Sequence, residues 1–543
     1  MSGKTTPDLE QVSVIETTRP VESTTINIQE ATEIYGNAEI AESYGYVARG
    51  LKARHVQFMG LGGSIGTALF LGIGRALAAT GPLSMFLGFL ITGAAIWGMV
   101  SFKPHEEESV NLISPQMQCL GEMTTWLPVS GALPVFASRY VDKALGFAVG
   151  WNVAVWISII IAILILLNVL AVSIYGEAEF WFASLKLITI VGLLILALII
   201  DLGGAPSHDR IGFRYWKNPG AMNTFIVDGN TGRFLGVVFA MIMAAYTYAG
   251  VESVVVAAGE AENPRKNLPK AVRRVFWRLL FFYIFGSLAV GVLVPYNDTA
   301  LLIALATSAP GAASSPWVIA IKRAGIPVLP SIINAVILSS ACSAGNAFLY
   351  NGSRYLMSLA QLGLAPSVFM RCSKRGIPYY SVGLTALFAP LTYLSCATGP
   401  AKVFIWLANL GTLVALTSWM AICVTYIRFY AALKVQGVDR SHLPFRSPFQ
   451  PYLAWSTLTF FSILTIFNGF YSFMPWNVET FLTTYIGIPI FISLLVFWKV
   501  FKKTKIVDPA EADLWTGKAA IDAEVWPQSE PQNFLEKVWA WIV

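Results

Sequence analysis

Long apolar stretches follow one another along most of the chain. About eleven of them are long enough to cross a bilayer as a helix, which takes about 20 mainly apolar residues. They lie at 56–79, 82–100, 144–174, 180–202, 234–258, 276–296, 328–350, 381–398, 403–427, 451–473 and 480–501. The pattern therefore predicts an all-α polytopic membrane protein.

Polar segments flank the apolar region. We predict a disordered cytoplasmic N-terminal tail over residues 1–50, a transmembrane domain over 51–502 and a cytoplasmic C-terminal tail over 503–543. The first segment lacks the apolar core of a signal peptide, so the first apolar helix should act as the insertion signal. Composition agrees, because 55% of the 543 residues are hydrophobic and only 13% are charged. A soluble domain carries about a quarter charged residues.

Basic residues cluster in alternate connections between the apolar stretches. The positive-inside rule places these clusters, and both termini, in the cytoplasm. The clusters lie at 49–54, 139–143, 265–278, 354, 371–375, 428–440 and 499–505. An intervening connection, 297–326, contains the glycosylation sequon Asn297-Asp298-Thr299, which is usable only on the outer face and supports the map weakly.

The first apolar stretch is unusually rich in glycine. The segment HVQFMGLGGSIGTALFLGIGRAL holds six glycines, a density that suits a continuous helix poorly. One interpretation is an unwound segment in mid-membrane, whose free backbone groups bind a substrate and line a cavity. The other is that small residues allow close helix packing.

The stretch at 234–258 favours the first interpretation. It places Gly250 and the acidic Glu252 well inside an apolar run. A carboxylate in the membrane is costly and usually faces a cavity or a partner. Two glycine-interrupted spans are typical of paired broken helices in an inverted repeat. Their half-helix ends can hold both the carboxylate and the ammonium of an α-amino acid.

A lysine also lies within an apolar run. Lys186, in FWFASLKLITIVGLL, stands about two turns from the predicted cytoplasmic end of its span. Its ammonium can snorkel to the membrane surface. Alternatively, it lies against the unwound carbonyls of the first span. Burial would then lower its proton affinity and let it load and release a proton during transport.

Enzymatic and metal chemistry are not expected. The five cysteines and four histidines are scattered, with no CxxC pair and no ligand pattern. The glycine-rich GLGGSIGTALFLG lacks the preceding strand and the GK[ST] ending of a nucleotide loop. The sequence therefore predicts no enzyme, no cofactor and no nucleic-acid partner.

Several long motifs make the chain similar to the fungal amino-acid permeases of the amino acid–polyamine–organocation superfamily. The matching motifs recur from about residue 44 to 517 and include GGSIGT, CLGEMTTWLP, SRYVDKALGFAVGWN, AGEAENPRKNLPKAV, SRYLMSLAQLGLAP and YIRFYAALKVQG. The resemblance implies a LeuT-like 5+5 inverted repeat with nominally twelve helices. It also implies proton-coupled amino-acid import across the plasma membrane by alternating access.

The resemblance also implies the residues of the site. Carried over by position, Ser64, Ile65, Gly66 and Thr67 would meet the substrate carboxylate. Tyr246, Ala249 and Gly250 would meet the amino group and side chain. Lys186 and Glu252 are the candidates for proton coupling, with Glu122 a weaker third. Ala68 departs from the family pattern, which usually has glycine there, so substrate specificity is less certain than fold.

The expected partners follow from this family assignment. They are an amino-acid substrate, a proton and the lipid bilayer, with ubiquitin-ligase machinery on the cytoplasmic tails. The sequence does not decide which amino acids are carried. No Arg or Lys near Tyr246 indicates a site for an acidic side chain, and we predict uptake of several amino acids.

One departure from the family interrupts its second helix. Residues 100–116, VSFKPHEEESVNLISPQ, separate GAAIWGM from MQCLGEM, and their charges cannot lie in lipid within a helix. A retained intron is one explanation of the insert, since the degenerate code permits Val100-Ser101 and Gln116 to be encoded by common splice-site sequences. A genuine cytoplasmic insertion that shortens the helix is the alternative.

A second departure falls at Asn152, where the third helix of the family is largely missing. The apolar run of about 33 residues around it is too long for one span and too short for two. Losing one span should invert every later connection and place the basic loop 265–278 outside. Besides a transporter, the sequence therefore allows a non-transporting sensor on the same fold, or an inactive product of a wrong gene prediction.

Overall fold

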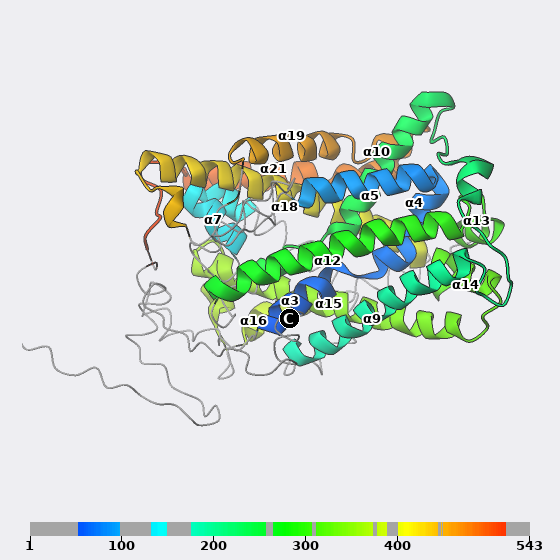
Figure 1. The fold of residues 1–543 in the computed structure, drawn as a ribbon. Coiled ribbons are helices and arrows are strands. Elements are labelled where there is room, and N and C mark those ends of the chain that lie inside the picture. The colour runs from blue at the N-terminus through cyan, green and yellow to red at the C-terminus, as the bar shows by residue number, and fades with distance from the viewer. Residues whose placement is uncertain are drawn as a thin grey trace, which may run out of the picture.

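A computed structural model describes residues 53–97, 132–148, 175–256, 264–306, 311–372, 377–387, 400–443, 447, 449–516 and 518. Within these ranges the chain is helical, and its only β contact is an isolated bridge between Phe473 and Trp476. Long helices lie side by side along one direction (Figure 1). The predicted all-α class is confirmed for the described residues.

Four long continuous helices form much of the bundle. They are α9 (Tyr175–Asp201), α12 (Pro264–Leu293), α15 (Leu329–Gln361) and α18 (Pro400–Val435). The shorter helices are α5 (Pro82–Trp97), α7 (Ala132–Tyr140), α13 (Thr299–Ala306), α14 (Pro316–Arg323), α16 (Tyr379–Ala386), α19 (Tyr452–Ile466), α20 (Val478–Tyr485) and α21 (Gly487–Lys502).

Two predicted spans are broken. The first consists of α3 (Ala53–Ser64), a π-helical turn η1 (Ala68–Gly72) and α4 (Ile73–Thr80). The other consists of α10 (Gly229–Tyr248) and the short α11 (Ser253–Val256). A π-turn inside a helix often marks a functional position.

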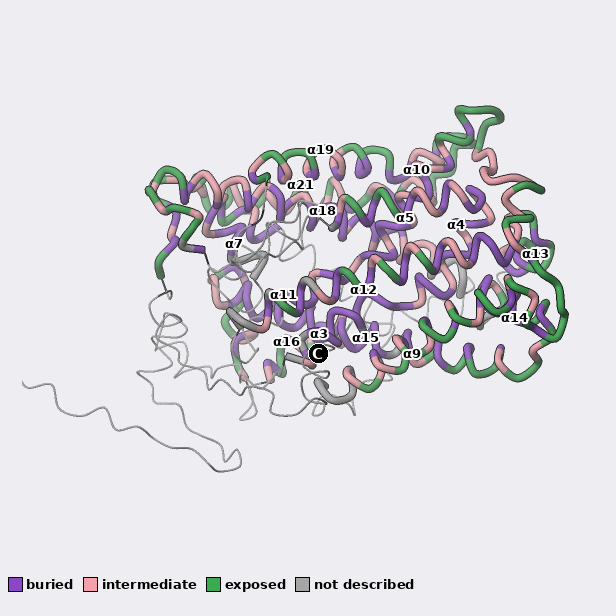
Figure 2. The backbone as a smooth tube through the Cα atoms, viewed as in Figure 1, coloured by how far each residue is buried: buried purple, intermediate pink, exposed green. Residues whose placement is uncertain are grey.

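Six described segments are long and apolar enough to cross a membrane, and α20 with α21, bent by 41°, makes a seventh if counted as one span. Side chains exposed on the outside of the bundle are often large and apolar, such as Ile188 at 70% and Val500 at 70% exposure. Figure 2 shows exposed positions along the outer helix α19 and buried ones along α3 and α15. Such a surface needs lipid to cover it. The protein is therefore a multi-pass membrane protein.

The expected inversion of the later helices is wrong for the described residues. The Arg54 guanidinium, in the first turn of α3, lies 5.4 Å from the ring centre of Phe180 near the start of α9. The basic start of α12 lies at the same end of the bundle (Figure 1). The reason is tertiary packing, because α9 is held between α3, α12 and α15. The insert 100–116 and the junction at Asn152 lie outside the described residues.

The beginning of the predicted C-terminal tail packs against the bundle. The backbone N–H of Val507 donates to the carbonyl of Val141 at 2.8 Å, and the Gln436 amide donates to the carbonyl of Ala512 at 2.7 Å. The Leu514 side chain is fully buried. Residues 504–516 therefore form a strap across α7 and the end of α18.

An ion pair closes the strap at its base. Lys499 of α21 donates to the carboxylate of Asp142, which follows α7. Partial burial acts to raise the pKa of Asp142, but the hydrogen bond from Lys499 and the backbone N–H of Ala144 outweigh burial and hold the pKa below its usual range. The charged pair thus joins the end of α7 to α21.

Candidate functional site

The first helix breaks directly after Ser64. The N–H of Gly66 donates to the carbonyl of Ser64, two residues earlier, at 2.8 Å. A hydrogen bond in an α-helix joins residues four apart, so the helix is interrupted here. The chain resumes with the π-turn at Ala68. A side chain at Gly60 would lie 2.1 Å from Val254, so the helix also needs a small residue for close packing before the break. The two interpretations of the glycine-rich stretch, unwinding and close packing, therefore both apply.

Neighbouring helices satisfy the backbone groups that the break releases. The Tyr283 hydroxyl of α12 donates to the carbonyl of Ser64 at 2.7 Å. The Ser340 hydroxyl of α15 donates to the carbonyl of Ile65 at 3.1 Å. The Ser64 hydroxyl is buried and has no hydrogen-bond partner among the described residues. Irregular backbone at membrane depth persists only with such partners, and the Ser64 hydroxyl remains available to a ligand.

The second helix breaks at Gly250. Ala249 leaves the helix with a ψ of 143°, and Gly250 follows with a φ of +92°. This left-handed conformation favours glycine because it has no Cβ. A Cβ on Gly250 would lie 3.1 Å from the carbonyl oxygen of Gly63. The two breaks are therefore in direct contact.

A cavity of about 270 Å³ lies at the meeting point of the two breaks. Among the residues predicted for the site, it is lined by Ser64, Gly66, Thr67, Tyr246, Ala249, Gly250 and Glu252. Ile65 is not part of the lining, because its side chain is buried in the core and only its carbonyl contacts α15. The departure from the family pattern, Ala68, borders the cavity.

The rest of the lining comes from α15 and α18, two helices that the sequence analysis did not assign to the site. Small residues dominate it, together with a few larger apolar side chains. From α15 these are Ala341, Ala344, Gly345, Phe348 and Tyr355, and from α18 Leu407, Ala408, Gly411, Val414, Ala415 and Ser418. The sequence signal that could have identified this wall is a stripe of small residues at helical spacing on each of the two helices. Such a stripe is equally typical of close packing between helices.

Among the described residues that line the cavity, only Glu252 carries a charge. The indole N–H of Trp419 points to its carboxylate at 3.5 Å, the limit of a hydrogen bond. A carboxylate in such a setting can exchange a proton or pair with a cation. Glu122 lies outside the described residues.

Lys186 lies in the interior behind the first break. Its side chain is fully buried, and its ammonium donates to the Ser343 hydroxyl of α15 at 2.8 Å. This contact excludes snorkelling to the membrane surface. Ser340, one turn earlier on α15, holds the carbonyl of Ile65. One face of α15 thus contacts both Lys186 and the broken segment.

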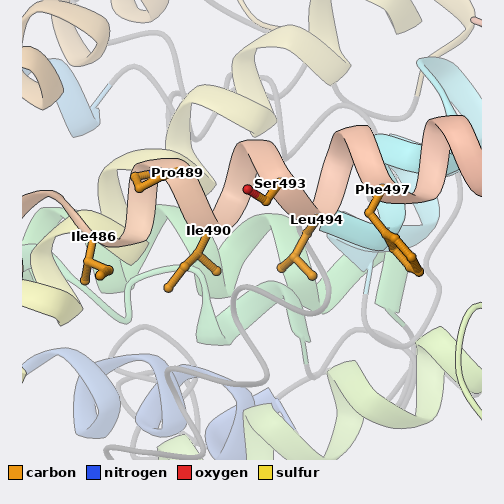
Figure 3. Close-up of a pocket in the computed structure, with 6 residues that line it drawn as sticks. All are labelled: Ile486, Pro489, Ile490, Ser493, Leu494 and Phe497. Carbon is orange, nitrogen blue, oxygen red and sulfur yellow. The ribbon is translucent and has the colours of Figure 1, made fainter.

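A second hollow, of about 430 Å³, lies along α21 (Figure 3). It is lined by Ile486, Pro489, Ile490, Ser493, Leu494 and Phe497. All but Ile486, which directly precedes the helix, lie on one stripe of α21, and Ser493 supplies the only polar side chain among the six. The hollow is therefore suited to lipid contact and not to polar chemistry. No group of three or more potential metal ligands occurs in the part of the chain that the structure describes.

Two helices that break side by side inside an apolar bundle, around a cavity whose described lining holds one carboxylate, define a membrane transporter and not an enzyme. The sequence profile of the amino acid permease family matches residues 55–102, 109–158 and 153–509. The chain belongs to the amino acid permease family.

Similar permeases cover nearly the whole chain. A probable proline-specific permease, put4, of Schizosaccharomyces pombe is 40% identical over 93% of this chain and 95% of its own length. A proline-specific permease of Emericella nidulans is 38% identical over 92% of this chain and 94% of its own length. A lysine-specific permease of Saccharomyces cerevisiae is 38% identical over 91% of this chain and 82% of its own length. These relatives support amino-acid import as the activity.

The match to the family is interrupted at both places where the sequence departs from it. The first interruption, between residues 102 and 109, lies within the insert 100–116. The second is beside Asn152, where the matched segments 109–158 and 153–509 overlap at residues 153–158. The alignment with the S. pombe permease extends over 545 positions, although it covers only 93% of the 543 residues. Some positions of the S. pombe permease therefore have no counterpart in this chain.

We predict that the transcript differs from the given sequence at both places. Sequencing it across codons 95–160 should show that codons 100–116 are absent and that extra helix-coding sequence follows near Asn152, because an interrupted second helix and a missing third span suit a transporter poorly. A transcript identical to the given sequence would contradict this and favour an inactive product.

Proposed function

We propose that this protein imports amino acids across the plasma membrane by alternating access, driven by a proton gradient. The observation that carries the proposal is the contact of Gly63 with Gly250, where two broken helices meet around one cavity. A LeuT-like 5+5 repeat with both termini in the cytoplasm is the architecture proposed with it, since broken helices in corresponding halves are its typical feature.

The backbone of the first break is proposed to bind the substrate carboxylate. Ser64, Gly66 and Thr67 border the cavity, and Ile65 contributes backbone to the same turn. The start of a half-helix carries a partial positive charge and free N–H groups, which suit a carboxylate. The unpartnered hydroxyl of Ser64 adds one more donor at this place.

The second break is proposed to bind the rest of the substrate. Tyr246, Ala249 and Gly250 border the cavity opposite the first break. Carbonyls freed at the end of α10 can accept from the α-ammonium. Lys186 and Glu252 are proposed to carry the coupled proton. Glu122 remains a proposal from the family resemblance alone.

The lining supports uptake of several neutral amino acids. No cation accompanies Glu252 among the described lining residues, so an acidic substrate side chain finds no counter-charge there. Relatives of similar identity carry the names proline-specific and lysine-specific. Similarity therefore does not select one substrate.

Uptake of radiolabelled L-proline into yeast cells that lack their own proline permeases tests the proposal. We expect accumulation that depends on an inward proton gradient and disappears with a protonophore. Among the twenty amino acids, small and apolar ones should compete and Asp and Glu should not. Inhibition by proline alone would contradict the broad range, and surface expression without any uptake would favour a sensor or an inactive product.

A further inference from the structure

The short helix α11 lies directly beyond the second break and is packed into the bundle. All four of its residues are buried, and they contact α3, α12 and α15. Figure 2 shows α11 beside α3. A Cβ on Gly60 would lie 2.1 Å from Val254, and a Cβ on Gly63 would lie 3.2 Å from the Ser253 hydroxyl. The side chains of α11 therefore pack directly against the backbone of α3.

α11 covers the side of the cavity that faces the cytoplasm in the proposed orientation. Ser253 lies against Gly63, next to the first break, and Val254 lies against Gly60, closer to the start of α3. α11 therefore runs back along α3 from the break. The start of α3 carries Arg54, and the basic start of α12 lies at the same end of the bundle (Figure 1). The positive-inside rule makes this end the cytoplasmic one.

One side-chain hydrogen bond ties α11 to α15. The Asn351 amide of α15 donates to the hydroxyl oxygen of Ser253 at 2.6 Å. Asn351 is 3% exposed and Ser253 is 1% exposed, so the bond is shielded from water. The side-chain oxygen of Asn351 is also buried and has no hydrogen-bond partner among the described residues. Within the described part of the chain, the polar end of Asn351 is therefore bound to α11 alone.

The backbone of the second break allows α11 to move as a unit. The N–H of Ser253 donates to the carbonyl of Gly250 at 3.0 Å, within the break itself. The N–H of Val255 donates to the carbonyl of Glu252 at 2.9 Å. These bonds do not reach back to α10, and a few irregular residues between two helices are typical of a hinge. Contacts with the neighbouring helices therefore decide where α11 lies.

We propose that the hydrogen bond from Asn351 to Ser253 is a latch that holds the cavity closed toward the cytoplasm. Asn351 is then a positioning residue for substrate release, because breaking the bond lets α11 leave α15 and opens a path beside the first break. Ser253 directly follows Glu252, so the latch lies on the same hinge as the proposed proton carrier. The inference rests on the proposed function and adds a release step to it.

Labelling a cysteine in the cavity from each side of the membrane tests the latch. Ala408→Cys places a thiol on the α18 wall, where a membrane-impermeant maleimide reaches it only from the side to which the cavity is open. In Ser253→Ala and in Asn351→Leu, labelling in inside-out membrane vesicles should be about tenfold faster, as for loss of one buried hydrogen bond. Labelling from the outside should be slower. Labelling of each variant without Ala408→Cys is subtracted.

Combining the two substitutions tests whether the two side chains act as a pair. Asn351→Leu keeps the approximate size of the side chain, and Ser253→Ala removes only the hydroxyl. Since both remove the same bond, the double variant should label no faster from the cytoplasmic side than either single variant. A double variant in which the two effects multiply would overturn the latch, because the side chains would then act independently.

Ser287→Ala is the matched control. Ser287 of α12 is fully buried, and its hydroxyl donates to the carbonyl of Ile284 in the same helix at 2.8 Å. The substitution removes a bond within one helix, so labelling should equal that of the unchanged protein.

Three results would overturn the latch. They are unchanged labelling in both Ser253→Ala and Asn351→Leu, faster labelling from both sides, which indicates loosened packing, and an equal effect in Ser287→Ala. Labelling does not require transport. Absence of L-proline uptake by the unchanged protein would therefore overturn the proposed function and leave the closure of the cavity to be decided by labelling.

Discussion

Lys186→Ala is expected to abolish proton-driven accumulation of L-proline. A pH difference of one unit supplies about 1.4 kcal/mol per proton, enough for roughly tenfold accumulation if one proton enters with each substrate. Without the coupling group the ratio of internal to external proline should fall to about one. Proteoliposomes with an imposed pH gradient measure this ratio directly.

The physical reason is the place of Lys186 in the packing. Its ammonium is fully buried and donates to Ser343, on the α15 face that also holds the carbonyl of Ile65. Gain or loss of its proton therefore changes a contact beside the broken helix. Without Lys186 there are no longer two protonation states with different contacts, so a proton gradient cannot shift the transporter between conformations through this residue.

Two further variants separate coupling from folding. Glu252→Gln removes the only charge among the described cavity residues without changing the size of the side chain, and it should also abolish accumulation. Ser343→Ala leaves the ammonium in place and should reduce accumulation only in part. Accumulation at the level of the unchanged protein in Lys186→Ala or Glu252→Gln would remove that residue from the mechanism.

Gly250→Ala is expected to reduce L-proline uptake at least tenfold while the protein still reaches the membrane. Its φ of +92° costs an alanine roughly 1–2 kcal/mol. The added Cβ would also lie 3.1 Å from the carbonyl of Gly63 and 3.3 Å from the carbonyl carbon. The two breaks must then separate, and the backbone groups proposed to bind the substrate move with them. Initial uptake per surface-exposed transporter measures the effect.

Gly363→Ala is the matched control for backbone strain. Gly363 has a φ of +67°, and nothing lies within 4 Å of the position of its Cβ. The substitution should cost stability without disturbing the cavity, so uptake per transporter should be retained. Equal losses in the two variants would assign the effect to strain and not to contact between the breaks.

The sequence by itself determined the class of protein and much of the candidate site. Length and apolarity predict spans locally, because a helix satisfies its own backbone in lipid whatever its neighbours are. The glycines near Ser64 and the Gly250–Glu252 pair indicated both breaks, since glycine density and a carboxylate within an apolar run are local signals. The family motifs added Thr67 and Tyr246, which line the cavity.

Only the tertiary structure decided which distant elements meet. The wall formed by α15 and α18 and the contact of Lys186 with Ser343 join residues far apart in the chain. Tertiary packing also set the direction of α9 and the docking of Leu514. Small and apolar residues on a membrane helix look alike whether they face lipid, a neighbouring helix or a cavity. Their role depends on helix packing, which no local pattern of residues specifies.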